Sequence, residues 1–201
     1  MEDVRPHDLL RINDNSDLIS YTPVPEWVEQ SLDKASYVVV RRVTSKEGLI
    51  AVGVRGSVRS ERFAAFLPIE NIIERITPEQ LAKKRKWEGQ TSELFFALGT
   101  ISEVMNHYGL SWGPVGSVGF ELASGVSTVT KQSDIDLIIR DHEGLNQSLA
   151  QALLDLFTTL PFRVDAQVEM EEGAFSLSEF AFPTGQHILL RTMNGPLLKK
   201  I

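Results

Sequence analysis

The sequence predicts an α/β (α+β) fold in two parts: a small β-rich N-terminal domain over residues 1–80, then a C-terminal domain over residues 81–201 whose mixed sheet is flanked by helices. Three observations lead to this prediction. Runs of β-branched residues follow one another in the first part. Amphipathic helices alternate with short apolar strands in the second. A basic segment opened by proline, near residues 76–90, separates the two parts.

Three strands are predicted in the first domain. Residues 1–36 are rich in Pro, Asp, Asn and Ser and predict irregular structure, with a short helix near PEWVEQSL. The runs 37–42 (YVVVRR) and 49–55 (LIAVGVR) predict a hairpin, and 62–68 (RFAAFLP) adds a third strand. PIENIIER and TPEQLAKKRKW then predict two short helices, the second basic enough to be a solvated linker.

The second domain alternates helices with strands. TSELFFALGTISEVMNHYG has the clearest helical pattern, and its apolar stripe consists of Leu94, Leu98, Ile101, Met105 and Tyr108. WGPVGSVGFELASG predicts a glycine-broken strand and turn that open a short helix at GFELA, and DIDLIIR predicts the next strand. GLNQSLAQALLDLFTTLP predicts a second amphipathic helix, and RVDAQVEM and HILLRT predict two further strands.

Charge is unevenly distributed along the chain. The net charge is −7, yet residues 1–90 carry 14 Lys/Arg and 14 Asp/Glu, whereas residues 91–201 carry 6 and 13. The overall acidity argues against a nonspecific nucleic-acid binder. A basic patch in the first domain is nevertheless suited to one polyphosphate ligand. Its members are Arg41, Arg42, Lys46, Arg55, Arg59 and Arg62.

Composition also limits the compartment. Because the chain has no cysteine, it has neither a disulfide, nor a thiolate metal site, nor a cysteine nucleophile. The sequence shows no signal peptide and no apolar stretch near the roughly 18 residues that a membrane-spanning helix needs. We therefore expect a soluble, cytoplasmic protein that has no membrane partner.

Two aspartates stand one residue apart at the front of the strand DIDLIIR. In a strand, Asp134 and Asp136 point to the same face, so two like charges lie close together. A divalent cation between them would make the arrangement favourable. Asp165, in the next acidic strand, supplies a third carboxylate. Such an oxygen-rich site suits Mg²⁺, which keeps coordination positions for phosphate oxygens.

A glycine-serine turn precedes this pair. At Gly116 and Ser117 the backbone N–H groups and the hydroxyl can approach a terminal phosphate, helped by a helix N-terminus. Together with the carboxylates, the turn predicts metal-assisted attack on phosphorus with diphosphate as the leaving group. Each part also has a purely structural explanation, such as a capped turn or the solvated face of an edge strand at Asp165 and Glu169. The ordered combination favours the catalytic explanation.

The order GS…SDIDLII…VDAQVE resembles the nucleotidyltransferase superfamily related to DNA polymerase β, over about residues 112–170. The segments RPHDLLRI, VVVRR, VGVRGSVRSERFAAFLP and GPVGSVGFELASGV extend the similarity over nearly the whole chain. They resemble the malonate decarboxylase holo-acyl-carrier-protein synthase family, also called phosphoribosyl-dephospho-CoA transferase. This resemblance implies a nucleotidyltransferase-like fold for the C-terminal domain.

The resemblance implies that a serine of the apo acyl-carrier subunit of malonate decarboxylase receives a phosphoribosyl-dephospho-CoA group. The donor would be 2′-(5″-triphosphoribosyl)-3′-dephospho-CoA, and diphosphate would be released. The implied catalytic residues and Mg²⁺ ligands are Asp134, Asp136 and Asp165, with Glu169 as an alternative to Asp165. The implied substrate-binding residues are Gly116, Ser117, Lys131, Arg41, Arg55, Arg59 and Arg62. An acidic carrier would dock near the basic first domain or the cleft.

Two alternatives remain open at this point, one within the same class of enzyme and one from a different class. One is another Mg²⁺-dependent nucleotidyltransferase, which would transfer an adenylyl group to a small molecule or a protein. The other is a non-catalytic module that binds the carrier. The choice of malonate decarboxylase over the citrate lyase system rests on the family resemblance alone.

Overall fold

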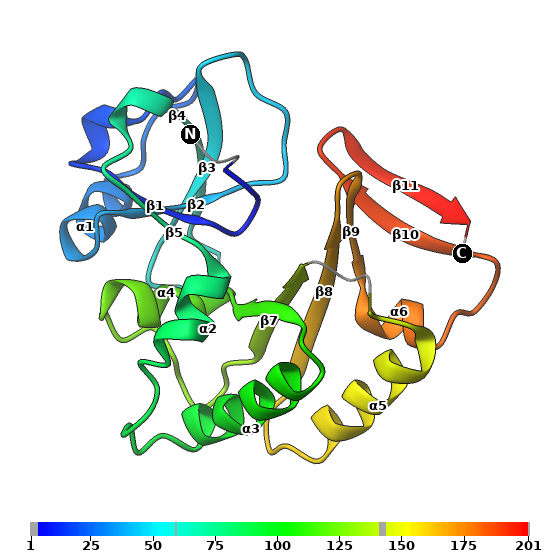
Figure 1. Cartoon of the computed structure of the whole chain (residues 1–201). Coiled ribbons are helices and arrows are strands. Elements are labelled where there is room, and N and C mark those ends of the chain that lie inside the picture. The colour runs from blue at the N-terminus through cyan, green and yellow to red at the C-terminus, as the bar shows by residue number, and fades with distance from the viewer. Residues whose placement is uncertain (1–3, 59, 141–143, 201) are drawn as a thin grey trace.

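The computed structural model describes residues 4–58, 60–140 and 144–200. Its strands form two sheets, one from each part of the chain, and helices pack against both (Figure 1). This mixed α+β architecture confirms the predicted fold class. Among the described residues, no helix combines the length and apolar character needed to cross a membrane.

The N-terminal sheet is antiparallel and has the strand order β4-β3-β2-β1-β5. Helix α1 (Glu26–Lys34) packs on one face, and two short 3-10 helices, η1 (Asn15–Asp17) and η2 (Ile69–Asn71), lie in its connections. The predicted hairpin, third strand and short helix are confirmed. The strands are β1 (Leu9–Arg11), β2 (Tyr37–Val40), β3 (Leu49–Arg55), β4 (Arg62–Pro68) and β5 (Glu74–Ile76).

The two faces of this sheet pack against different parts of the molecule. Side chains alternate along each strand, so neighbouring residues point to opposite faces. Leu10 and Val52 belong to the core that includes Val28 of α1. Leu9 and Ile76 belong instead to the core of the C-terminal part. The second face of the N-terminal sheet is therefore turned toward the C-terminal domain.

Three predictions for the first part are wrong. Residues 1–36 are not irregular throughout, because they contain the buried strand β1. PIENIIER forms η2 and β5 instead of a helix, since β5 pairs with β1 through a contact distant in sequence. TPEQLAKKRKW does contain helix α2 (Pro78–Lys84), capped by Thr77, but it is not a solvated linker because Leu81 and Trp87 are buried.

The C-terminal sheet is mixed, as predicted, with the order β11-β10-β9-β8-β7-β6. Strands β7 and β8 are parallel and the other pairs are antiparallel. The strands are β6 (Ser111–Pro114), β7 (Ile135–Arg140), β8 (Val164–Met170), β9 (Gly173–Ser176), β10 (His187–Thr192) and β11 (Gly195–Lys200). The helices are α3 (Glu93–His107), α4 (Gly116–Ser124), α5 (Gln147–Thr158) and α6 (Leu177–Ala181).

Helices α3 and α5 lie side by side against this sheet (Figure 1). The α3 stripe from Leu94 to Met105 is buried as predicted, but Tyr108 is 46% exposed because the helix has already ended there. Helix α4 begins at Gly116, three residues before GFELA. Strands β9 and β11 and helix α6 were not predicted, since β9 and α6 are short and the edge strand β11 is largely exposed.

The two faces of β7 and β8 differ in chemistry. Ile135, Leu137 and Ile139 point into the core formed with α3 and α5. The opposite face carries carboxylates at one end and a buried arginine, Arg140, at the other. Arg140 donates a hydrogen bond to the Pro6 carbonyl (2.6 Å), so this face is turned toward the N-terminal part.

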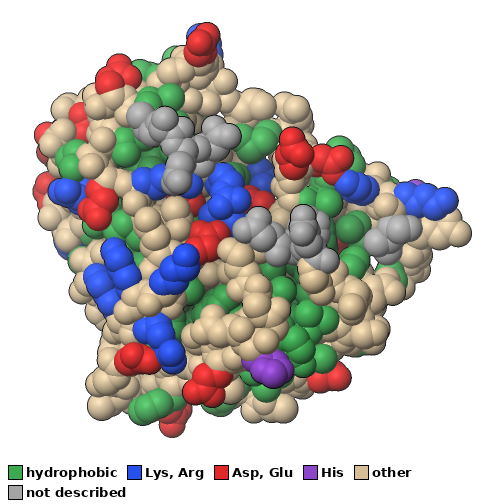
Figure 2. Space-filling view, in the orientation of Figure 1, with side chains coloured by type: hydrophobic (Ala, Val, Ile, Leu, Met, Phe, Trp, Pro, Cys, Tyr) green, Lys and Arg blue, Asp and Glu red, His purple; other side chains and the backbone are tan. Residues whose placement is uncertain are grey.

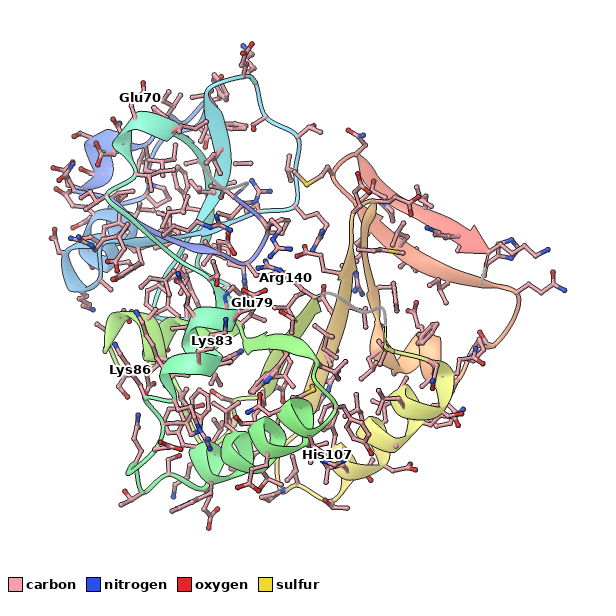
Figure 3. All side chains as sticks on the ribbon, in the orientation of Figure 1. Glu70, Glu79, Lys83, Lys86, His107 and Arg140 are labelled. Carbon is pink, nitrogen blue, oxygen red and sulfur yellow. The ribbon has the colours of Figure 1, made fainter. Side chains whose placement is uncertain are left out.

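A buried ion-pair network joins the two parts around Arg140, which is only 1% exposed. Its Nη1 donates to Asp8 (3.3 Å) and to Glu79 of α2 (3.0 Å), and its Nε donates to Glu169. Figure 3 shows Arg140 and Glu79 meeting where α2 and β7 approach each other. Three further arginines pair with the carboxylates of this network: Arg42 with Glu169 and Arg75 with Asp8, each at 2.7 Å, and Arg5 with Glu79 at 3.7 Å.

Candidate active site

The three aspartates lie at the front of two neighbouring parallel strands. Asp136 of β7 is directly opposite Asp165 of β8, and Asp134 immediately precedes β7. Residues opposite each other in a sheet place their side chains on the same face. Asp136 and Asp165 therefore share the face that is turned toward the N-terminal part.

The pKa of Asp136 shows how these charges act on one another. Burial is the main cause that raises the pKa of this carboxyl, from 3.8 to about 6, and the charges of Asp165 and Asp134 add to it. Arg55 and Arg62 act in the opposite direction and lower it. A carboxylate that is desolvated and repelled by two others is suited to bind a cation or to accept a proton.

Gly116 lies directly against Asp136. It has a left-handed backbone (φ +62°), and a Cβ placed on it would overlap the Oδ2 of Asp136. The preceding residue, Val115, donates its N–H to the Asp136 carbonyl (2.9 Å). Gly116 also begins helix α4, and among the described residues no side chain caps that helix. The first N–H groups and the positive end of the helix dipole are thus close to the carboxylates.

The loop between α4 and β7 is held against the helix. Glu121 accepts hydrogen bonds from the N–H groups of Thr128 and Val129, both at 2.7 Å. The Thr128 hydroxyl donates to the carbonyl of Ser117, whose side chain is nearly buried. Lys131 is exposed in the turn at the end of this loop, three residues before Asp134.

The arginines predicted to bind phosphate have different locations. Arg55 and Arg62 are opposite each other at one end of the N-terminal sheet, on β3 and β4. The positive charges of these two arginines act on Asp136. Arg41 follows β2, with its side chain packed over Gly53 of β3. Arg59 lies outside the described residues. The structure thus brings Arg55 and Arg62, from a distant part of the chain, to the carboxylates.

Glu169 occupies a different environment from Asp165. It lies four residues further along β8, is 7% exposed, and is paired with Arg42 and Arg140. The alternation predicted for β8 is correct, but this end of the strand is buried against the N-terminal part and is not a solvated edge. Of the two acidic residues proposed as the third carboxylate, Asp165 is the one beside Asp136.

Comparisons with known proteins extend to both sheets. The family model of the MdcG C-terminal domain of phosphoribosyl-dephospho-CoA transferase matches residues 80–200. The model of the MdcG N-terminal domain matches residues 5–78. The chain belongs to the MdcG family. This membership confirms the resemblance found in the sequence and, with it, the class of enzyme, a transferase.

Several curated relatives carry the name phosphoribosyl-dephospho-CoA transferase. The protein from Pseudomonas putida is 37% identical over 195 residues, which cover 96% of this chain and 92% of the relative. The one from Azotobacter vinelandii is 38% identical over 200 residues, with the same coverage. The one from Pseudomonas aeruginosa is 34% identical over 193 residues, or 96% and 90% of the two chains. No solved structure matches the chain.

The donor set of this MdcG protein fits Mg²⁺ only in part. Among the described residues, no three His, Asp or Glu side chains already converge closely enough to hold a metal ion. Mg²⁺, however, is commonly bound through one or two carboxylates, with waters and substrate phosphates completing its shell. Asp136 with Asp165 or Asp134 supplies such a pair, so the fit requires the phosphates of a bound donor.

The close approach of Gly116 to Asp136 predicts different effects of alanine at the two ends of α4. Gly116 and Gly125 both have a positive φ, so alanine strains the backbone at either position by roughly 1 kcal/mol. Only at Gly116 does the new Cβ also displace the Asp136 carboxylate. We expect Gly116→Ala to lower group transfer at least tenfold more than Gly125→Ala, with both rates measured at a temperature at which circular dichroism shows each variant to be folded. Equal activities would contradict the placement of Gly116 in the site.

Proposed function

We propose that this protein transfers phosphoribosyl-dephospho-CoA from 2′-(5″-triphosphoribosyl)-3′-dephospho-CoA to a serine of the apo acyl-carrier subunit of malonate decarboxylase. Diphosphate is released and the holo carrier is formed. The observation that carries the proposal is the charge arrangement at Asp136. The charges of two other carboxylates and two arginines act on Asp136, which lies beside an uncapped helix N-terminus, within a chain of the MdcG family.

Each group has a role in binding the triphosphate. The missing side chain at Gly116 lets the Asp136 carboxylate lie against the first turn of α4. A phosphate bound beside this carboxylate would meet the positive end of the helix dipole, which favours negative charge. Arg55 and Arg62 face the carboxylates from the N-terminal sheet and neutralise the charge of the phosphates that leave as diphosphate. Figure 2 shows Lys and Arg side chains gathered with acidic ones around the junction of the two parts.

The transfer is a displacement at the phosphorus nearest the ribose. The serine hydroxyl oxygen forms a bond to this phosphorus, and the bond from phosphorus to the bridging oxygen of the diphosphate breaks. Asp165, exposed at the front of β8 beside Asp136, accepts the proton of the serine. Mg²⁺ held by Asp136 and Asp134 would neutralise developing charge on the phosphate oxygens. The product is a serine phosphodiester.

Intact mass of the carrier tests the proposal. The apo carrier, the donor and Mg²⁺ are incubated with the protein, with Asp134→Asn, or with Asp155→Asn. Asp155 is exposed on α5 and serves as a matched substitution outside the site. We expect a mass gain equal to the donor minus diphosphate with the protein and with Asp155→Asn, but not with Asp134→Asn or without metal. A folded, unmodified carrier that gains no mass would refute the proposed transfer.

The arginines from the N-terminal sheet are expected to affect both donor binding and the carboxylate. Because Arg55 and Arg62 lower the pKa of Asp136, Arg62→Gln should move that pKa above about 6 in the metal-free protein. The same variant should raise KM for the donor about tenfold, as expected for the loss of one charge-assisted contact. Carboxyl ¹³C NMR titration and initial rates measure the two effects. Lys34→Gln, at an exposed position of α1, should change neither quantity.

A further inference from the structure

A cavity lies at the end of the N-terminal sheet away from the carboxylates. Its volume is about 280 Å³, and its wall is mainly aliphatic. Most of the wall comes from the N-terminal part, but Met193, in the turn between β10 and β11, closes one side. The Met193 carbonyl accepts a hydrogen bond from the N–H of Thr44 (3.2 Å), which holds the turn against the β2–β3 connection. The wall includes Val40, Val43, Leu49, Ile69 and Met193.

One face of β3 leads from the carboxylates to this cavity. Leu49, Ala51, Gly53 and Arg55 alternate along the strand and share a face. Arg55 acts on Asp136 at one end, while Leu49 and Ala51 line the cavity at the other. The strand separates the two ends by six residues, or about 20 Å. Between them, Gly53 is opposite Ala64 of β4, so neither of these residues has a long side chain on this face.

Arg41 lies midway along the same face. A Cβ on Gly53 would be 3.4 Å from the Cδ of Arg41, so this side chain covers the glycine. Arg41 also lines the cavity. A cation therefore stands between the site of the phosphates and the aliphatic cavity. A ligand that extends along this face from the carboxylates would contact the positive charge of Arg41 and, beyond it, the apolar wall of the cavity.

We propose that the cavity binds the pantetheine arm of the donor and that Arg41 binds the adjacent diphosphate. This inference rests on the proposed function. In the donor, the chain runs from the reacting phosphate through two riboses with adenine, then a diphosphate, and ends in pantetheine and its thiol. The face of β3 presents features in the same order: Arg55 at the reacting phosphate, Arg41, then the aliphatic cavity. The terminal thiol therefore lies near Met193.

The absence of cysteine from the chain allows a direct test by disulfide trapping. Met193→Cys and Leu198→Cys each introduce one thiol in the same hairpin, at positions 40% and 70% exposed. The probe is the symmetrical disulfide of 3′-dephospho-CoA. The introduced thiolate attacks one sulfur, a protein–dephospho-CoA disulfide forms, and one dephospho-CoA thiol is released. Intact mass spectrometry measures the rate at which this protein–dephospho-CoA disulfide forms. For each variant, this rate is divided by the rate of the same cysteine with 2-hydroxyethyl disulfide, so that differences in the intrinsic reactivity of the two cysteines cancel.

We expect the normalised rate to be at least tenfold higher for Met193→Cys than for Leu198→Cys. Adding Arg41→Gln to Met193→Cys should remove most of that difference. Equal normalised rates at the two positions would overturn the inference, and so would a preference that Arg41→Gln leaves unchanged. The readout needs neither carrier nor transfer. If the carrier is labelled but Met193→Cys shows no preferential trapping, only the pantetheine site is refuted. If trapping is preferential but the carrier is not labelled, only the proposed transfer is refuted.

Discussion

Asp136→Asn is expected to reduce group transfer by about 10²–10⁴-fold while making the metal-free protein more stable at neutral pH. The two effects have one cause, the loss of the negative charge of this carboxyl. Burial and the charges of Asp165 and Asp134 make its ionised form unfavourable in the folded state. Asparagine retains the size of the side chain but carries no charge, so it removes the repulsion together with the reactive group.

The sign of the pH dependence follows from the raised pKa. The pKa of Asp136 is about 6 in the folded state against an ordinary value of 3.8. The folded protein thus keeps a proton that the unfolded chain releases, and the stability linked to it is complete below about pH 3.8 and lost as the pH rises through about 6. At pH 7, Asp136→Asn should recover on the order of 1–2 kcal/mol of the free energy of unfolding.

Urea denaturation of the metal-free protein at pH 4 and pH 7 measures this effect. The stability difference between Asp136→Asn and the unaltered protein should be small at pH 4 and large at pH 7. Mg²⁺ with donor should reduce it by stabilising only the protein that retains the carboxylate. Asp155→Asn, on the exposed face of α5, should show no such pH dependence. A lower stability of Asp136→Asn at pH 7 would show that Asp136 is not repelled in the folded state.

Arg140→Met is expected to destabilise the protein by about 3–5 kcal/mol, the largest stability loss that we predict. Arg140 is 1% exposed and holds Asp8, Glu79 and Glu169 together with the Pro6 carbonyl. Methionine fills similar volume but leaves these buried carboxylates with fewer cations than they require. The desolvation cost of the uncompensated charges then appears in the free energy of unfolding.

The matched control is Arg11→Met. Arg11 pairs with Glu74 at 3.1 Å, but both side chains are more than 40% exposed. Solvent screens such a pair, so its loss should cost only about 0–1 kcal/mol. Denaturant titration of both variants at the same pH gives the comparison. Similar costs for the two substitutions would mean that the buried network contributes no more than a surface ion pair.

Local pattern was sufficient for most elements of the fold. The 3.6-residue period of α3 and α5 and the alternation in β8 depend only on neighbouring residues. The same local geometry places Asp134 and Asp136 together at the front of β7. Where the pattern failed, as at β1 and β5, the missing information was a pairing between segments more than 60 residues apart.

The composition of the site depended on tertiary structure. Sequence alone could not choose between Asp165 and Glu169, because both point to the same face of β8; the parallel register with β7 puts Asp165 beside Asp136 and Glu169 beside Arg140. The sequence also could not show which of the basic residues act on Asp136. Arg55 and Arg62 do so because the N-terminal sheet packs over the C-terminal one.

The sequence by itself therefore determined most of the element types, the family and the carboxylate pair, because these follow from the residue pattern along single segments. The register between strands and the packing of the two sheets decided which charges meet. Charges interact through space over a few ångströms, and that distance is set by contacts between residues far apart in the chain. The Arg140 network is the clearest instance, since it draws its partners from four separate segments of the chain.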